Sequence, residues 1–317
     1  MTANTKKILI TGAAGYIGFQ LGERLCREYA VVGVDIRSRN DAHFHIETMD
    51  IRSHRLAQFI ADENVTHVIH LASVVEPSRD VSRDYDIDVN GTRNLLEACV
   101  KNNVRHLTVT SSGAAYGYHA DNPAWLKESD PLRGNDEFSY AAHKRIVETM
   151  LARYREHYPA MQQLIFRPGT VLGANTNNMI TQLFNGRRLL TISGSDSPFV
   201  FIWDQDVVGA IEQGLREDKT GIYNLAGDGA LSMRDIAALI NKPVMNLPAG
   251  LLRWLLRIGK LLKLTRYGPD QINFLRYRPV LSNQALKDSF GYRLNKTSRE
   301  TFEFFLAHRS TDTGNPS

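Results

Sequence analysis

The chain has 317 residues, of which 43% are hydrophobic and 23% are charged, and its formal net charge is +4. This length is enough for one large domain or two interlocked domains with a substantial core. The net charge is mild and no dense Lys/Arg block occurs, so nucleic acid is not expected as a partner. We expect only a modest attraction for anionic small molecules.

The cysteine count and the ends of the chain further narrow the class of protein. Cys26 and Cys99 fall within predicted helices and lack metal-ligand spacing, so we expect no metal site and a reducing, cytoplasmic location. No signal peptide is expected before the first predicted strand, and no apolar stretch reaches the ~18 residues needed to span a bilayer. Residues 309–317 are polar and predicted to be a disordered tail.

A glycine-rich motif, TGAAGYIG at residues 11–18, joins a predicted strand to a predicted helix over residues 16–29. Gly12 suits a sharp turn, Gly15 lets the main chain approach a pyrophosphate, and Gly18 lets the helix pack closely on the strand. The helix N-terminus then presents free N–H groups to the phosphates. The motif predicts a dinucleotide-binding turn in preference to a βα turn without a ligand.

The next predicted strand, residues 31–35, ends in Asp35. An acid about 20 residues beyond the glycines accepts hydrogen bonds from the adenosine ribose and repels a 2′-phosphate, so NAD is favoured over NADP. Arg37 and Arg39 follow closely and offer an alternative site for that phosphate, although we favour a solvated loop for them.

A third strand, predicted at residues 44–49, precedes Asp50 and Ile51. Ligands of open α/β sheets bind beyond the carboxyl ends of the strands. Asp50 is therefore a candidate partner for the adenine amino group, with Ile51 against the ring, and capping of the helix at residues 53–63 is a compatible second role for Asp50.

Strands and helices continue to alternate, which predicts an α/β fold with a Rossmann-type doubly wound parallel sheet. The expected strands lie at residues 67–72, 106–110 and 163–167, and the expected helices at 84–102 and 139–157. His70 within the first of these strands is expected to be a core residue. Beyond residue 170 the expected elements are a helix at 179–185, strands at 199–203 and 222–225, and a helix at 204–216.

This pattern predicts two domains. Residues 1–170, completed by segments near 199–226, are expected to bind NAD, and residues 171–198 and 227–308 to form a smaller, mostly helical C-terminal substrate domain. The segment 249–263 is amphipathic and cationic, so it could lie on a membrane surface. A place in the core or lid of the substrate domain is the interpretation we favour for it.

Tyr140 and Lys144 lie four residues apart, on the same face of one predicted helix. An ammonium beside a phenol stabilises the phenolate, which can take the proton of a carbinol as its hydride leaves. Ser112, after the strand at 106–110, is placed to hydrogen-bond the same substrate oxygen.

Together these features resemble the extended short-chain dehydrogenase/reductases of the NAD-dependent epimerase/dehydratase family. The resemblance covers nearly the whole chain and rests on residues 11–18, 35, 50–51, 70–72, 89–92, 111–117, 140–144 and 167–168. It implies that Tyr140 is the general acid/base, that Lys144 favours its ionised form and holds the nicotinamide ribose, and that Ser112 orients the reacting oxygen. It also implies a homodimer through the helices near Asn90 and Tyr140.

The motifs and the resemblance together give a set of expected cofactor-binding residues. They are Gly12, Gly15, Tyr16, Ile17, Asp35, Ile36, Arg37, Asp50, Ile51, Leu71, Ala72, Ser73, Asn90, Tyr140, Lys144 and Pro168.

Departures from the family pattern narrow the range of reactions and substrates expected for this chain. Gly113 and Ala114 stand where the family's sugar-nucleotide dehydratases have an Asp-Glu pair, so dehydration is not expected. Thr170, Pro198 and Phe199 stand near positions where many nucleotide-sugar epimerases hold the diphosphate with Asn and Arg. Arg276 or Arg278 is a candidate for that phosphate contact.

The leading hypothesis is an NAD-dependent epimerase or dehydrogenase acting on a secondary hydroxyl, with a nucleotide sugar as one candidate substrate and a 4-epimerase-like pattern at residues 111–117. An NAD(P)-dependent reductase of a hydrophobic, non-nucleotide carbonyl compound is the alternative, because diphosphate contacts are missing and a Leu-rich helix surrounds Trp254. A non-enzymatic dinucleotide sensor is a second alternative, disfavoured because both Tyr140 and Lys144 are present.

Overall fold

The fold is taken from a computed structural model that describes residues 6–76, 78, 80–261 and 272–309. Within these residues a seven-stranded sheet has the order β10-β6-β5-β4-β1-β2-β3, and every neighbouring pair is parallel. The predicted doubly wound sheet is therefore confirmed. Its strands are β1 (Lys7–Thr11), β2 (Ala30–Asp35), β3 (His45–Thr48), β4 (His67–His70), β5 (His106–Thr110), β6 (Gln162–Pro168) and β10 (Gly221–Leu225).

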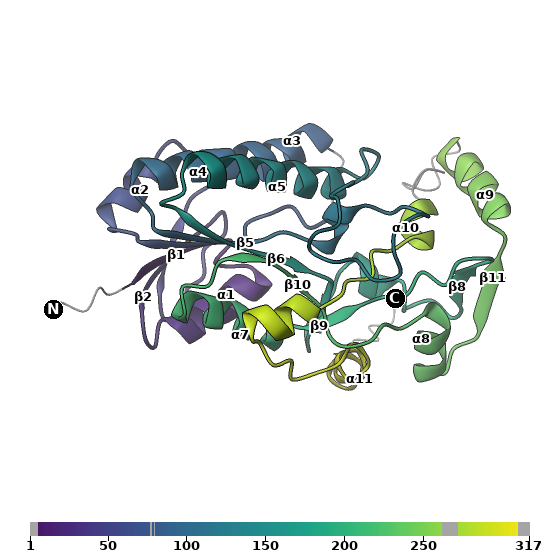
Figure 1. Ribbon diagram of the computed structural model, residues 1–317. Helices are drawn as coiled ribbons and strands as arrows, with labels where there is room; N and C mark the ends of the chain where they lie inside the picture. Colours follow the sequence, from purple (N-terminus) through teal and green to yellow (C-terminus); the bar gives the residue numbers. More distant parts are fainter. Residues whose placement is uncertain (1–5, 77, 79, 262–271, 310–317) are drawn as a thin grey trace.

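Helices cover both faces of this sheet (Figure 1). On one side lie α2 (Leu56–Asp62), α4 (Gly91–Lys101) and α5 (Ser139–His157), and on the other α1 (Tyr16–Leu25) and α7 (Asp204–Arg216). The single helix predicted over residues 84–102 is instead α3 (Val81–Tyr85), a π-helical turn (Asp86–Asn90) and α4 in succession.

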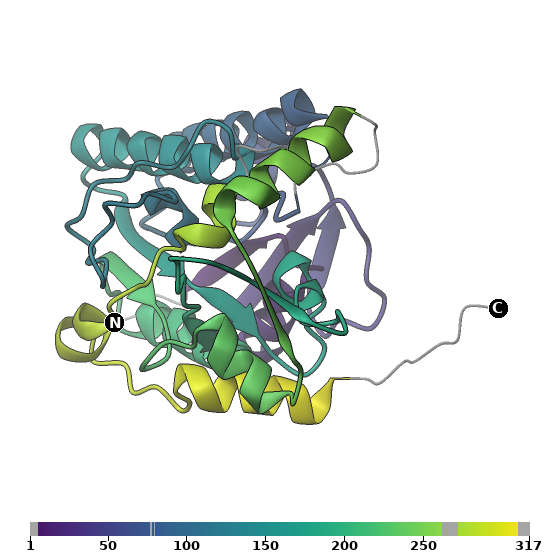
Figure 2. The same cartoon turned by 90° about the vertical axis from the view of Figure 1, so that its right-hand side faces the viewer.

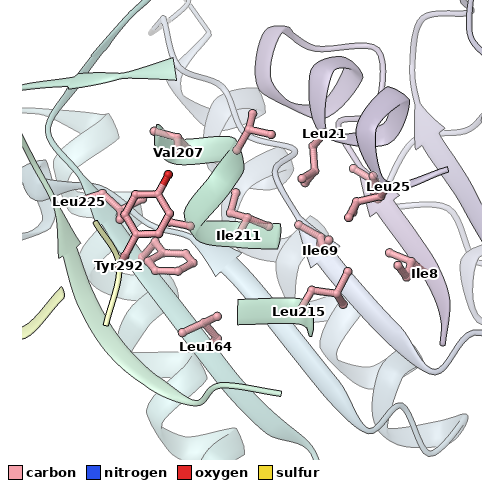
Figure 3. Close-up of a cluster of buried hydrophobic side chains, with 14 of the residues drawn as sticks. Ile8, Leu21, Leu25, Ile69, Leu164, Val207, Ile211, Leu215, Leu225 and Tyr292 are labelled. Atoms are coloured by element: carbon pink, nitrogen blue, oxygen red, sulfur yellow. The ribbon is translucent and has the colours of Figure 1, made fainter. Parts of the chain in front are cut away.

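Successive side chains of a strand point to opposite sides of the sheet, and the central strands contain consecutive apolar residues, so both faces of the sheet are apolar. Ile8 of β1 joins the core beneath α1 and α7, whereas Leu9 joins the core beneath α2, α4 and α5. Figure 3 shows the first of these cores, in which Leu21 and Leu25 of α1 meet Ile211 of α7. The central sheet is thus buried on both sides and positions its strand ends rigidly.

The later part of the chain contains two small parallel sheets that the sequence did not predict, beside its helices. β7 (Thr170–Leu172) pairs with β9 (Phe201–Trp203), and β8 (Leu189–Ile192) pairs with β11 (Val244–Leu247). The helices here are α6 (Met179–Gln182), α8 (Met233–Leu239), α9 (Ala249–Leu261), α10 (Ile272–Arg276) and α11 (Ser298–His308). Of the segments expected to complete the NAD domain, β10 joins the large sheet but β9 does not.

Figure 1 shows α9 at the right-hand edge of the molecule, and in Figure 2 this helix faces the viewer, next to α10. None of the helices in the described part of the chain combines the length and apolarity that a membrane crossing requires. The predicted tail at 309–317 lies, apart from Arg309, outside the described residues.

A buried ion pair fixes the end of β5. Arg167 of β6 lies 2.6 Å from Glu148 of α5, and their side chains are 4% and 3% exposed. Glu148 also accepts a hydrogen bond from the Ser111 hydroxyl, and Arg167 donates to the phenol oxygen of Tyr116. Because Ser111 precedes Ser112 directly, this network holds the turn that carries the predicted catalytic serine.

A second buried link joins β1, β4 and α4 through His70. The Thr92 hydroxyl donates to the Asp88 carbonyl, so Thr92 accepts from Nε2–H of His70 at 3.0 Å. Nδ1 of His70 then accepts from the Thr11 hydroxyl at 2.7 Å. Burial, with a smaller effect of Lys144, lowers the pKa of His70 to about 3. His70 is therefore a neutral core residue.

The buried, neutral His70 predicts that the free energy of unfolding depends on pH. The unfolded chain takes up a proton at His70 near its ordinary pKa of 6.5, whereas the folded chain does not until about pH 3. The free energy of unfolding should therefore fall by ~1.4 kcal/mol per pH unit below pH 6.5 through this group alone. In urea unfolding at pH 7, 6 and 5, His70→Gln should be less stable at pH 7 and should lose less stability on acidification. Parallel pH profiles for the two proteins would contradict this assignment.

Candidate functional site

The site lies where the strand connections reverse direction. From β1 the chain winds outward to β2 and β3, and from β4 it winds the other way to β5 and β6. The carboxyl ends of β1 and β4 therefore border a crevice, which is where ligands bind in open α/β sheets. A cleft of about 960 Å³ opens at this point.

Every predicted catalytic or cofactor-binding residue except Asn90 lines this one cleft. The lining residues among them are Gly12, Gly15, Tyr16, Ile17, Asp35, Ile36, Arg37, Asp50, Ile51, Leu71, Ala72, Ser73, Ser112, Tyr140, Lys144 and Pro168. Their individual roles stay predictions, but the structure brings them together from segments up to about half the chain apart.

Asn90 is the exception, and the prediction that it contacts the cofactor is not supported by its position. Its side-chain amide instead bonds to Asp86 and Arg93 on the helix surface. Asp88, two residues earlier and hence on the opposite side of the helix, is buried against the loop after β4.

Asp88 was missed by the sequence reasoning, although its spacing carries a signal. It lies four residues before the buried Thr92 and is itself 4% exposed. Its carboxylate accepts hydrogen bonds from Ser73, from the main chain of Val74 and from Nδ1 of His143. Burial would raise the pKa of Asp88, but these hydrogen bonds and the charge of Lys144 outweigh burial, so the pKa lies below its ordinary value. Asp88 therefore holds the loop after β4 against α5.

The glycine motif fits a dinucleotide. Gly12 has φ of +73°, and a Cβ on it would lie 2.8 Å from the main-chain nitrogen of Ala72. A Cβ on Gly18 would lie 2.1 Å from the carbonyl oxygen of Gly12. Gly15 caps α1 with no side-chain hydrogen bond, so the first-turn N–H groups of α1 are open toward the cleft. This is the arrangement that binds a pyrophosphate.

Asp35 is held at the other end of this turn. Its carboxylate accepts from the main-chain nitrogens of Ala14 and Arg37, both at 3.0 Å, and it is 7% exposed. Its place at the end of β2 matches that of a ribose-binding acid. The Arg37 side chain is 67% exposed, as expected for a solvated loop.

Asp50 lines the cleft next to Ile51, but its carboxylate is already engaged. Arg52 donates to both of its oxygens, from Nε at 3.0 Å and from Nη2 at 2.6 Å. These hydrogen bonds hold the pKa of Asp50 below its ordinary range. Asp50 does not cap the following helix, because α2 begins only at Leu56 and has no side-chain cap.

Tyr140, Lys144 and Ser112 form the predicted reactive end. Tyr140 is half-buried in the first turn of α5, and Lys144 Nζ lies 5.6 Å from the centre of its ring. Lys144 is 8% exposed and donates to the carbonyl of Thr110 at 3.2 Å. The Ser112 oxygen accepts from the main-chain nitrogen of Ala114 at 3.1 Å, which leaves its hydroxyl hydrogen for a ligand.

Tyr16 connects the cofactor loop to the later part of the chain. Its hydroxyl donates to Asp204, the first residue of α7, at 2.6 Å. Burial and then Asp204 raise the pKa of Tyr16 to about 12. Gly173 is required here, because a Cβ on it would lie 2.1 Å from the Asp204 carboxylate.

Arg278, rather than Arg276, lies in the wall of the cleft. Its guanidinium carbon is 3.9 Å from the ring centre of Phe199, and Nη1 donates to the carbonyl and hydroxyl oxygens of Ser197. Within the described residues its side chain has no carboxylate partner, and its buried Nε has no acceptor. Desolvation lowers the pKa of Arg278 to about 9. The cleft thus contains a cation that no carboxylate among the described residues pairs with.

Comparison of the sequence with known proteins identifies the family. Residues 8–226 match the model of the NAD dependent epimerase/dehydratase family. An N-acetyl-alpha-D-glucosaminyl-diphospho-ditrans,octacis-undecaprenol 4-epimerase of Escherichia coli O157:H7 is 28% identical and is matched over 76% of this chain and 75% of its own length. An uncharacterized protein of Mycobacterium tuberculosis is 25% identical over 96% of this chain and 84% of its own length.

Solved structures share the fold. The UDP-glucose 4-epimerase of Thermus thermophilus in complex with NAD has a TM-score of 0.71 at 23% identity, covering 95% of this chain and 99% of that one. WbmG of Bordetella bronchiseptica with NAD and UDP has a TM-score of 0.74 at 18% identity, covering 96% and 94%. The family match spans more than half of the chain and includes the glycine turn, Ser112, Tyr140 and Lys144. The chain therefore belongs to the NAD dependent epimerase/dehydratase family, and it is an enzyme that uses NAD.

Proposed function

We propose that the protein is an NAD-dependent 4-epimerase of a sugar that carries a diphosphate on its anomeric carbon. The observation that carries this proposal is Arg278, a cation without a carboxylate partner among the described residues, in the same cleft as Ser112, Tyr140 and Lys144. A diphosphate would supply the missing anion. The E. coli relative is named for a 4-epimerase of a glycosyl-diphospho-undecaprenol, and the Thermus structure for a UDP-glucose 4-epimerase, which supports this substrate class.

The chain's own residues supply the proton chemistry. Tyr140 takes the proton of the C4 hydroxyl, and Lys144 stabilises the phenolate that accepts it. Ser112 donates a hydrogen bond to the same oxygen as it becomes a carbonyl. When bound, NAD supplies the hydride acceptor. Epimerisation would require the ketone to turn in the cleft so that its other face meets the cofactor, and Tyr140 would then return the proton to the C4 oxygen.

The turn after β5 favours epimerisation over dehydration. Ala114 offers no carboxylate to remove a C5 proton, and a Cβ on Gly113 would lie 2.9 Å from Leu281. That space is filled by an apolar side chain. A hydrophobic, non-nucleotide ketone is the less favoured substrate, because it would leave the Arg278 guanidinium without a counter-charge.

A homodimer and a cytoplasmic location complete the proposal. α4 and α5 pack together on one face of the sheet (Figure 1), and Tyr154 and Tyr158 at the end of α5 form an aromatic pair with Tyr158 44% exposed. These helices offer a surface for a second copy. Cys26 and Cys99 are both free thiols, in keeping with a reducing compartment.

The first prediction concerns Tyr140. Wild-type protein should convert UDP-glucose, UDP-N-acetylglucosamine or a polyprenyl diphospho-N-acetylglucosamine into its C4 epimer, detected by NMR of the product. Tyr140→Phe should lower kcat about 100-fold or more with bound NAD unchanged, because the proton acceptor is lost. An unimpaired Tyr140→Phe enzyme, or wild-type protein that epimerises none of these glycosyl diphosphates, would contradict the proposal.

A second prediction separates the substrate class from the chemistry. Arg278→Gln should raise KM for the glycosyl diphosphate about 10- to 100-fold, since a hydrogen bond to a charged group contributes ~1.5–3 kcal/mol. Its effect on kcat should be smaller. Arg276→Gln is the matched control and should leave KM unchanged, because Arg276 does not line the cleft. Equal effects of the two substitutions would count against a diphosphate at Arg278.

A further inference from the structure

Helix α9 presents a second, outward apolar face that the proposed reaction does not use. Its inner face is anchored by Leu252, which is 9% exposed and packs in one cluster with Ile192 of β8 and Ile272 of α10. On its outer side Leu251, Trp254 and Leu255 are 44%, 58% and 45% exposed. The core placement favoured from the sequence therefore holds for one face only.

The exposed residues form a continuous stripe. At 100° per residue, Leu251, Trp254 and Leu255 fall within one arc of about 100°, separate from the arc of Leu252. Arg253 and Arg257 occupy the neighbouring arc, and both are exposed. The sequence of α9, AGLLRWLLRIGKL, contains no acidic residue. We call Leu251, Arg253, Trp254, Leu255 and Arg257 the α9 surface.

The chemistry of the α9 surface matches a lipid headgroup region. Leucines with a tryptophan, flanked by cations and free of acids, are the composition of helices that lie in the plane of an anionic membrane. Tryptophan is enriched at the boundary between headgroups and acyl chains. A second protein copy would meet two arginines for which the described residues show no carboxylate partner, whereas anionic phospholipid offers both an apolar layer and the opposite charge. We propose that the α9 surface docks the protein on an anionic phospholipid bilayer.

Docking through α9 would bring the cleft close to the membrane. α9 packs on α10, and Figure 2 shows the two helices next to each other. Phe274 of α10 lines the cleft, and so does Arg278 shortly after it. This step rests on the proposed function: for a glycosyl diphosphate substrate, the placement suits a substrate whose diphosphate is linked to a membrane lipid. The docking itself does not depend on the reaction.

Co-sedimentation with vesicles tests the docking directly. At 0.1 M NaCl, wild-type protein should sediment with vesicles of phosphatidylcholine and phosphatidylglycerol (7:3) and much less with phosphatidylcholine alone. Trp254→Ser/Leu255→Ser should reduce the partition coefficient about tenfold or more, because the apolar contact is lost. Arg253→Gln/Arg257→Gln should reduce binding to the anionic vesicles about 30-fold, at ~1 kcal/mol per cation.

Trp125→Ser is the matched control, because Trp125 is 45% exposed but lies outside α9. It should bind vesicles like wild type. The proposal is overturned if wild-type protein ignores anionic vesicles, if it binds neutral ones equally, or if the double variants bind as wild type does. A change in oligomeric mass of Trp254→Ser/Leu255→Ser by light scattering would also overturn it and assign the surface to a protein interface. Vesicle binding needs no substrate, and epimerisation of a water-soluble UDP-sugar needs no vesicle, so the two proposals fail separately.

Discussion

The close approach of β1 and β4 at their carboxyl ends is the constraint on which the site depends. Gly12 turns the chain so near to Ala72 that a single methyl group there would lie 2.8 Å from the main-chain nitrogen. Directly below, His70 connects β1 to α4 through two threonine hydroxyls. The chain winds away from this junction in opposite directions, and the crevice between the two windings is the cleft. A dinucleotide can approach the main chain only because no side chain stands in this turn.

Buried charge is balanced differently along the cleft. At the reactive end, Lys144 lies near Asp88, and Asp88 is tied to His143 and to the loop after β4. Beneath it, the Arg167 and Glu148 pair holds β6, α5 and the end of β5 together. Removing one partner of such a pair would leave an uncompensated buried charge, at a cost of ~3–5 kcal/mol. Arg278 differs from these groups, because its counter-charge must come from outside the described protein residues.

The sequence predicted the elements that have strong periodicity and clear ends. The helices at 139–157 and 204–216 and the strand at 106–110 have the predicted bounds. Several expected site residues, such as Gly12, Asp35 and Ala72, could be assigned to the cleft from sequence because they lie at or just beyond the carboxyl end of a strand. Asn90 bonds along its own helix and does not line the cleft, whereas Asp88, on the other side of the π-helical turn, is buried. The contact between Tyr16 and Asp204 and the position of Arg278 depend on long-range packing, and no local pattern reports such packing. The two small sheets were missed for the same reason, since β8 and β11 are short and pair across about 50 residues.

The central claim is that one cleft removes a hydride from a sugar carbon and returns it to the opposite face. Its most direct test uses a glycosyl diphosphate carrying deuterium at C4, turned over in ordinary water with the enzyme's own NAD. The C4 epimer should keep its deuterium, because the label would pass to the nicotinamide and come back to the same carbon. Replacement of the deuterium by solvent hydrogen would contradict it, because it would show that C4 loses a proton and not a hydride.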